Sequence, residues 1–489
     1  MALPSILKSG DVARLLPVVP ESKKEAKAAS VLLAILSSVK PYGEIMLGSI
    51  GQKVGKRTSL AGYTEVVFTN DNGASKSRPD GLLVVESGSG KRWTALIEAK
   101  IGRAELQADQ IERYLALAKS QGIDAVITLS NQFATIPSHS PIKVSKSLTK
   151  SVDLYHWSWV FVWTQAKLLL NEDVFENDAS KYLLTEMVRY FGHHSIGVTR
   201  FDRMNSGWKD LVTRIQAGAV IQKNDSDVEA SVSAWHQEIR DLCLLLSRGM
   251  GTVVYAQIPR SHRDSAEVRM KEDSEYLIKN HRLYAKLDIP DAAAPLEIVA
   301  DLLRRSVCVY MVVSAPKDKK KTSARLNWLL RQLNKTELDN VYIRANWPGR
   351  APSTQASLKD LKEDVTLIEG GNKNLSPASF EVMLVHDMAG KFTGTKTFIE
   401  QLESAVPKFY KEVGQYLRAY VPPPPKLQSR SKTNIPQGIN VESESLDPVR
   451  PEDESNWERI KSEDQQDRVN NIQSNANRDN IAQPPVNED

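Results

Sequence analysis

Residues 78–100, RPDGLLVVESGSGKRWTALIEAK, decide the fold of the N-terminal part, because they hold two apolar runs joined by a glycine-rich turn. Leu82–Val85 and Trp93–Ile97 read as buried strands, since continuous apolar runs bounded by turn residues are typical of strands covered on both faces. With the turn centred near Ser89, antiparallel pairing places residues whose numbers sum to about 178 opposite each other. Asp80 and Glu98 then become cross-strand neighbours.

Two opposed carboxylates destabilise a sheet unless positive charge lies between them. Glu98 and Lys100 are two residues apart on a strand, so their side chains share a face. We expect a Mg²⁺ or Mn²⁺ ion at this position, because such ions prefer hard oxygen ligands and are commonly held by one or two carboxylates plus substrate phosphates. Lys100 would stabilise the attacking water or the charge that develops on the phosphate. The alternative is that Asp80 and Glu98 are solvated residues of an ordinary hairpin.

Pro79-Asp80, the hydrophobic hairpin and Glu98-Ala99-Lys100 resemble the core motif of the PD-(D/E)xK nuclease superfamily. The resemblance covers about residues 21–157. It implies a restriction-endonuclease-like mixed sheet flanked by helices. It also implies that Asp80, Glu98 and the Ala99 carbonyl bind the metal and that Lys100 is the electrostatic catalyst.

A helix predicted over 104–121 carries Gln110 and Tyr114. This pair is similar to the Gln-x-x-x-Tyr motif of RecB-like members of that superfamily. Residues four apart share a helix face, so Gln110 and Tyr114 are expected to point together towards the bound strand or the metal. Tyr114 has an equally good interpretation as a core residue.

A further acid is expected upstream of the hairpin, and two residues are candidates. Asn72-Gly73 is a strong hairpin turn, so pairing numbers that sum to about 145 place Glu65 opposite Asp80. A slip of one residue in this longer loop would turn Glu65 to the other face. Glu44 is the alternative; it lies just past a predicted helix over 24–39 and resembles a first-helix acid of other relatives. We favour Glu65.

Basic residues surround the predicted site, with Arg78 and Arg103 closest to it in the sequence. Far along the chain, Lys319, Lys320 and Lys321 precede a helix predicted over 323–334, and lysines at a helix N-terminus favour a bound anion. Both groups predict nucleic-acid contacts. Their alternative interpretation is a solvated surface.

Length and charge set the outer limits on function. The chain has 489 residues, 41% of them hydrophobic, and a formal net charge of +4. Residues 421–489 contain 8 Lys and Arg against 13 Asp and Glu, which leaves about +9 for the part before them. Cys243 and Cys308 lack metal-ligand spacing and lie far apart, so neither a zinc site nor a disulfide scaffold is indicated. No apolar run approaches the ~20 residues that span a bilayer, and we expect a cytoplasmic protein without membrane insertion.

The pattern along the chain predicts five segments. Residues 1–20 are a leader, 21–175 the nuclease-like domain, 176–250 a helical bridge, 251–420 a second mixed α/β domain, and 421–489 a disordered tail that is Pro-rich and then acidic. Within 176–250 a long helix is predicted over 228–248. The second domain is predicted to have strands at 283–289, 306–314 and 340–346, and a closing helix over 396–417 that is kinked or broken at Pro407.

The sequence therefore predicts a metal-dependent nuclease that hydrolyses phosphodiester bonds in DNA or RNA, by analogy within defence or repair. The alternative is a catalytically silent nuclease-fold protein that binds or senses nucleic acid. The oligomeric state is left open, a homodimer being one alternative.

Overall fold

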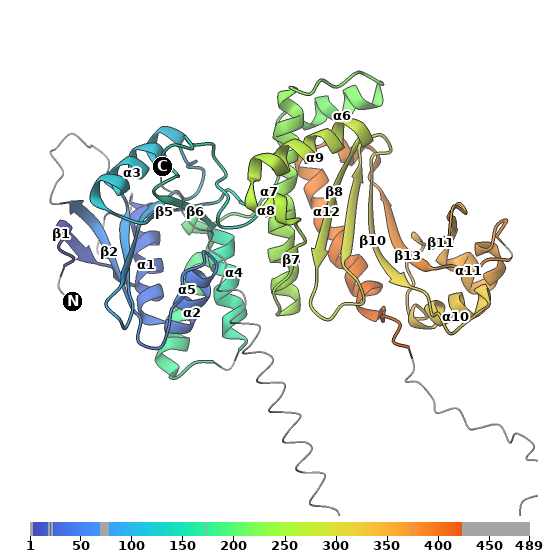
Figure 1. The fold of residues 1–489 in the computed structure, drawn as a ribbon, viewed down its shortest axis with the longest axis horizontal. Helices are drawn as coiled ribbons and strands as arrows, with labels where there is room; N and C mark the ends of the chain where they lie inside the picture. The colour runs from blue at the N-terminus through green and yellow to red at the C-terminus, as the bar shows by residue number, and fades with distance from the viewer. Residues whose placement is uncertain are drawn as a thin grey trace, which may run out of the picture. The chain divides into compact units, whose positions relative to one another are not determined.

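The computed structural model describes residues 3–17, 20, 23–68, 78–172, 174–372 and 374–422. All of these belong to one compact unit spanning Met1–Pro423. They form a mixed α and β structure with two separate sheets (Figure 1). The predicted tail 421–489 lies outside the described residues apart from Val421 and Pro422.

The first sheet has six strands in the order β1-β2-β3-β4-β5-β6. The first four strands pair antiparallel, whereas β4–β5 and β5–β6 are parallel, so the sheet is mixed, as predicted. The strands are β1 Leu7–Val12, β2 Ser59–Phe68, β3 Gly81–Glu86, β4 Arg92–Ala99, β5 Ala125–Ser130 and β6 Asp153–Ser158.

Both hairpin registers inferred from the sequence are confirmed. Gly81 of β3 lies opposite Ile97 of β4, and it also lies opposite Thr64 of β2. These pairs have the expected sums of about 178 and about 145. The turn predicted at Asn72-Gly73 lies outside the described residues. The register therefore carries Asp80 to the same edge of the sheet as Glu98.

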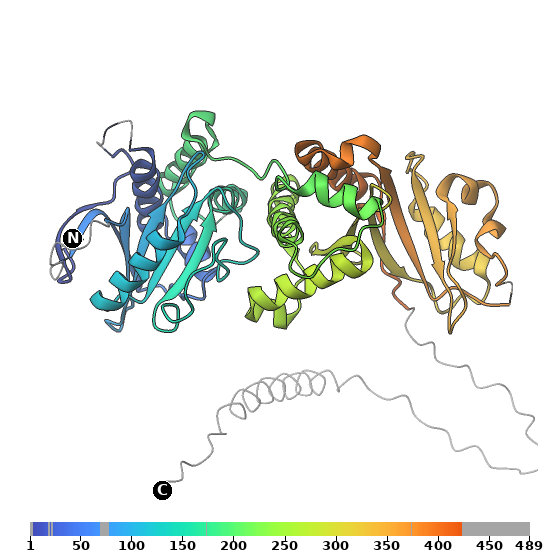
Figure 2. The ribbon, with the colours of Figure 1, turned by 90° about the horizontal axis from the view of Figure 1, so that it is seen from above.

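Helices cover the first sheet on both faces (Figure 2). Alternate strand residues divide between two cores: Leu82, Leu96 and Val126 pack with α3, while Leu83 and Ile97 pack with the helices of the other face. Because both faces are covered, β3 and β5 are continuous apolar runs. The helices are α1 Lys24–Ser38, α2 Lys40–Gly48, α3 Ala108–Gln121, α4 Trp159–Leu170 and α5 Asp178–Gly192.

Helix α7, Ser226–Met250, is the predicted long helix of the central region and ends at Gly251, whose φ is +71°. Its residues Trp235 and Ile239 belong to the core of the second sheet, whereas Leu244 belongs to a core of the first. The other elements of this region are η1 His194–Ile196, α6 Trp208–Gln216, α8 Arg260–Asp264 and α9 Ala266–Asn280. The helix α7 thus contributes apolar side chains to both sheets.

The second sheet is wholly antiparallel, with seven strands in the order β12-β11-β13-β10-β9-β8-β7. The three strands predicted in this region correspond to β8, β10 and β11. The strands are β7 Tyr255–Ala256, β8 Arg282–Asp288, β9 Leu296–Asp301, β10 Ser306–Ser314, β11 Val341–Asn346, β12 Thr354–Ser357 and β13 Ser379–Asp387.

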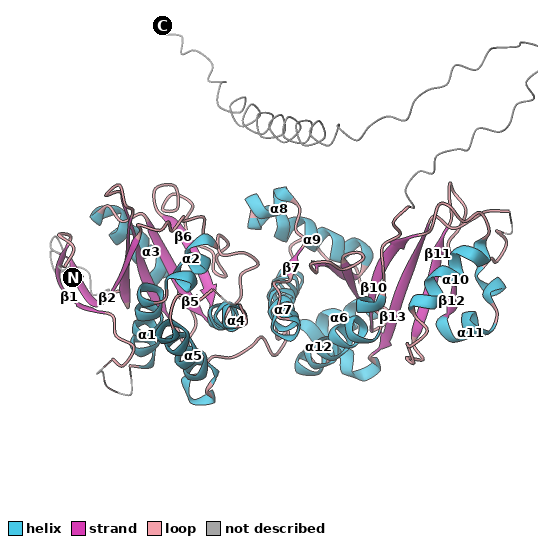
Figure 3. Ribbon diagram, turned by 90° about the horizontal axis from the view of Figure 1, so that it is seen from below, coloured by secondary structure: helices cyan, strands magenta, loops and turns pink. Residues whose placement is uncertain are grey.

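Helices pack on one face of the second sheet. Along β10, Val307, Val309 and Met311 are buried, and the residues between them are partly exposed. Figure 3 shows α12 alongside β10 and β13, and α10 and α11 near β11 and β12. The remaining elements are α10 Thr322–Gln332, α11 Leu358–Glu363, η2 Val365–Ile368, η3 Ala389–Thr393, α12 Thr395–Glu412 and η4 Gly414–Tyr416. Helix α12 continues through Pro407 without a break.

Among the described residues, no single helix is long and apolar enough to cross a membrane. The pair α1 and α2 passes that test of length and composition when taken together, with a bend of 108° between the two helices. Both helices contribute buried side chains to the core of the first sheet, including Leu33 and Met46.

Candidate active site

The hairpin brings Asp80 and the end of β4 into direct contact. Asp80 lies immediately before β3, and its Oδ2 accepts a hydrogen bond of 2.8 Å from the backbone N–H of Ala99. Lys100 follows β4 directly, and its own backbone N–H donates to the Leu129 carbonyl of β5 at 2.7 Å. These hydrogen bonds thus fix the backbone at the strand ends that carry Asp80, Glu98 and Lys100.

Glu98 is almost completely buried, with 2% of its surface exposed. Its Oε1 accepts hydrogen bonds from the Lys100 ammonium and, at 2.8 Å, from Gln110 Nε2 on α3. A buried carboxylate is tolerated only when it is paired and hydrogen-bonded, and Lys100 and Gln110 meet that requirement here. Lys100 and Gln110, which the sequence singles out separately, therefore both contact Glu98.

Burial and mutual charge shift the titration of the charged groups at the site. Burial and, after it, the charge of Glu98 raise the pKa of Asp80 to about 7, against the lowering effect of the Ala99 N–H and of Lys100. Burial also raises the pKa of Glu98, although the hydrogen bond and charge of Lys100 oppose it. Burial alone would lower the pKa of Lys100, but its contact with Glu98 raises it. Burial thus favours the protonated carboxyls, while the Glu98–Lys100 contact favours the charged pair.

Tyr114 is both a core residue and a polar contact of the site. It is a buried residue of α3, and its hydroxyl donates to the Arg78 carbonyl at 3.0 Å. Gln110 Nε2 lies 3.2 Å from the same hydroxyl. The interpretation of Tyr114 as a core residue is confirmed, and its hydroxyl in addition contacts Gln110 and the chain segment before Asp80.

Glu65 is not joined to the two carboxylates. The register points it towards Asp80, but its backbone has a φ of +50° and its Oε1 pairs with Lys23 Nζ at 2.9 Å. Its side chain is 40% exposed. Positive φ at a non-glycine residue breaks the strand alternation on which the expectation depended. Glu44, the alternative, is an exposed residue of α2.

The acid that the sequence interpretation missed is Glu25, in the first turn of α1. Its charge raises the pKa of both Asp80 and Glu98, so it acts on the site from the first helix. The sequence holds a signal for it, since Glu25 falls in the first turn of the helix predicted to begin at Lys24. The packing of α1 on the sheet, which brings its first turn to the strand ends, is not encoded locally.

The predicted nucleic-acid contacts divide between two places. Arg78 and Arg103 are exposed and lie within three residues of Asp80 and Lys100, respectively. Lys319, Lys320 and Lys321 belong to the second sheet's region, directly before α10. The basic residues that the sequence identified therefore form two separate groups, one beside the hairpin and one before α10.

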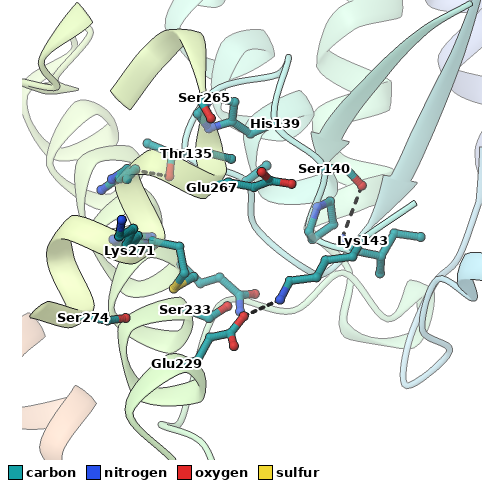
Figure 4. Close-up of a pocket in the computed structure, with 18 of the residues that line it drawn as sticks. Thr135, His139, Ser140, Lys143, Glu229, Ser233, Ser265, Glu267, Lys271 and Ser274 are labelled. Atoms are coloured by element: carbon teal, nitrogen blue, oxygen red, sulfur yellow. Dashed lines mark hydrogen bonds and ion pairs between the residues drawn. The ribbon is translucent and has the colours of Figure 1, made fainter. Parts of the chain in front are cut away.

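A cavity of about 1450 Å³ lies away from the hairpin site. The segment 133–155, α7 and α9 line it (Figure 4). Lys143 pairs with Glu229 across it, and Arg269 donates to the Thr135 hydroxyl. Its lining includes none of Asp80, Glu98 and Lys100, and it carries charges of both signs, which indicates no particular ligand.

A magnesium or manganese site would draw on few protein ligands. Among the described residues, no group of three or more His, Cys, Asp or Glu side chains is arranged to hold a metal. The donor set at the hairpin, two carboxylates with the neighbouring Ala99 carbonyl, consists of hard oxygens. That set suits an ion that keeps water and takes further ligands from a substrate. A scan against protein-family models and a search of curated proteins give no match to this chain.

Proposed function

We propose that the protein is a metal-dependent nuclease that hydrolyses phosphodiester bonds in DNA or RNA, with a restriction-endonuclease-like core of the PD-(D/E)xK type. The observation that carries the proposal is the contact set at the ends of β3 and β4. Asp80 is bound to the Ala99 N–H, and the buried Glu98 contacts Lys100 and Gln110. Buried charges of this kind, strongly perturbed in pKa, are typical of functional sites.

Asp80, Glu98 and the Ala99 carbonyl are the oxygens that would hold Mg²⁺ or Mn²⁺, and the ion would neutralise phosphate charge and activate water. Hydrolysis forms a bond between the oxygen of water and phosphorus and breaks the bond from phosphorus to one sugar oxygen, which leaves as a hydroxyl. The Lys100 ammonium, held by Glu98, would stabilise the negative charge that grows on the phosphate oxygens.

Three other groups would support this chemistry. Gln110 holds the Glu98 carboxylate, and Tyr114 holds Gln110 and the Arg78 carbonyl, so both are positioning residues. Glu25 adds negative charge on the side of α1 and strengthens the preference for a cation. Arg78 and Arg103 would contact the phosphate backbone on either side of the cut.

The test is a cleavage assay with plasmid, linear duplex, single-stranded DNA and RNA, in Mg²⁺, Mn²⁺ or EDTA. We expect metal-dependent cutting that Lys100→Ala and Asp80→Ala each lower by about 10²–10³-fold, the usual effect of removing one electrostatic catalyst. Glu86→Ala and Lys91→Ala are the matched controls, since both residues lie on the same hairpin away from the site.

The control variants should cut like the wild-type protein. Cutting in EDTA, or cutting that survives both Lys100→Ala and Asp80→Ala, contradicts the proposal. Tight nucleic-acid binding without cutting in any metal would instead favour the silent, nucleic-acid-binding alternative.

A further inference from the structure

A basic groove runs along helix α10 in the second sheet's region. It has a volume of about 590 Å³, and the residues that line it are Lys319, Ala324, Asn327, Leu330, Arg331, Asn334 and Lys362. Three of these side chains are cations, two are amides, and none is acidic. Such a lining attracts an anion and offers amide donors to its oxygens.

The spacing of the lining residues shows that the groove follows the helix axis. Ala324, Asn327 and Arg331 recur at intervals of three or four residues, which places them on one face of α10, and Asn334 lies just past the end of the helix. The 11 residues of α10 span about 16 Å at 1.5 Å per residue. One strand of duplex DNA presents about five phosphates over that length. The groove therefore matches an extended polyanion better than a single small anion.

The lysine loop at the start of the groove is held in place by side chains. Arg325 donates to the Lys319 carbonyl at 2.6 Å and to the Pro377 carbonyl at 2.7 Å, and Ser376 donates to the Lys320 carbonyl. Repulsion among neighbouring lysines opposes this fixed arrangement, and Asp318, 3.8 Å from Lys319, is the one acid within the loop. The backbone that carries Lys319 and Lys320 is therefore fixed.

Two further features favour an anion along this face. The first turn of α10 has no acidic residue and no side-chain cap, so its N–H groups add a partial positive charge beside Lys319. On the opposite wall, Lys362 of α11 is fixed by the Asn334 and Thr336 carbonyls at 3.5 and 2.9 Å. Lys362 thus supplies a cation at the far end of the groove.

We propose that the groove along α10 binds the phosphate backbone of a nucleic acid, as a contact separate from the cleavage site. The choice of nucleic acid over another polyanion rests on the proposed nuclease function of the same chain. Lys319 and Arg331 contact phosphates at the two ends of the helix, Asn327 donates to phosphate oxygens between them, and no base is read.

The test measures binding of labelled duplex DNA, single-stranded DNA and single-stranded RNA to the full chain by fluorescence anisotropy, in EDTA so that metal-dependent cutting is suppressed. The variant is Lys319→Gln with Arg331→Gln, which leaves the structural contacts of Lys362 intact. The control is Lys209→Gln with Lys279→Gln, two exposed lysines on α6 and α9. Thermal melts show whether each protein is folded.

Each lost phosphate contact flattens the dependence of log K on log[salt] by about 0.9 for duplex DNA. The groove variant should therefore bind more weakly, with a slope shallower by about two, while the control matches the wild-type protein. Equal affinity and slope in the wild type and the groove variant overturn the groove proposal. The groove proposal is also overturned if the wild-type protein binds none of the three nucleic acids. The same holds if, in the same anisotropy assay, the protein binds labelled polyglutamate but no nucleic acid.

The outcome is separate from that of the cleavage assay. If the groove proposal fails and the nuclease proposal holds, the groove variant binds and cuts like the wild type. If the nuclease proposal fails and the groove proposal holds, the variant loses binding in EDTA although no protein cuts in Mg²⁺.

Discussion

The two sheets accommodate charge in different ways. The second sheet carries most of its charged residues on the partly exposed face, where neighbouring strands supply their partners: Glu297 accepts hydrogen bonds from Tyr284 and Tyr310, both at 2.8 Å, and Arg344 pairs with Glu381 at 3.0 Å. The first sheet is covered on both faces, and its acidic pair stands at the ends of apolar strands. Cross-strand pairs at a solvent-exposed face stabilise a sheet modestly and indicate no particular function. Buried like charges destabilise the folded state, so their presence indicates a functional role.

The largest difference is expected in activity. Glu98→Gln should lower the cutting rate by about 10²–10³-fold, because it removes a charge from the site. Glu297→Gln makes the same chemical change on the second sheet and should leave the rate unchanged. Single-turnover cutting of a labelled duplex compares the two variants. Equal cutting rates would contradict the claim that only the acid of the first sheet takes part in catalysis.

A second comparison concerns stability. Val126 of β5 is fully buried on the first sheet, whereas Val299 of β9 is partly exposed on the second. Val126→Ala should cost about 2–3 kcal/mol of unfolding free energy and Val299→Ala less than about 1 kcal/mol, since transfer and cavity costs scale with burial. Urea unfolding measures both values. A larger cost at Val299 would show that the open face is covered in solution.

Buried acids also differ between the regions. Glu238 of α7 is fully buried, and neither carboxylate oxygen has a hydrogen-bond partner among the described residues. Burial, then Glu403 of α12 and Asp241 of the same helix, raises the pKa of Glu238 well above 4.5, and Arg200 opposes this. Glu98, by contrast, accepts hydrogen bonds from Lys100 and Gln110.

Because the folded state holds the Glu238 proton more tightly than the unfolded state, this group's stabilising contribution is present below about pH 4.5 and is lost as pH rises through the folded pKa. Glu238→Gln should therefore flatten the fall of stability with pH and raise stability above neutral pH by on the order of 1 kcal/mol. Thermal melts across a pH series test this, and an unchanged pH slope would contradict it.

The smallest effect is expected at Tyr114. Tyr114→Phe keeps the buried ring but removes the hydroxyl that contacts Gln110 and the Arg78 carbonyl, a loss of about 1 kcal/mol for one hydrogen bond. Cutting should fall by no more than about tenfold, without loss of metal dependence. A fall as large as that of Glu98→Gln would assign Tyr114 a direct part in the reaction.

The hairpin was predictable because its determinants are local. The positions of turn-type residues in the sequence predicted the registers that meet at Gly81, and strand and helix periodicity predicted that Lys100 and Gln110 lie near Glu98. Glu65 was misplaced because a positive φ at one residue reverses the strand alternation, and composition gives no sign of it. Glu25 was missed because its position depends on how α1 packs on the sheet.

The second sheet shows the same limit. Its strands β8, β10 and β11 were predicted from apolar alternation, but β13 inserts between β10 and β11 from far along the chain. No local pattern specifies such an insertion, because long-range pairing is decided by the burial of whole faces. The lysine segment before α10 was identified from the sequence. That Arg331 and Lys362 line the same groove depends on the packing of α11, which the sequence does not specify locally.

The central claim is that Asp80 and Glu98 together hold a divalent cation. Calorimetric titration of Mn²⁺ into the wild-type protein and into Asp80→Asn, with Glu86→Gln as the control, tests it most directly. The account predicts one saturable Mn²⁺ site in the wild type and the control, and its loss in Asp80→Asn. Equal Mn²⁺ binding by all three proteins, or by none of them, would contradict it.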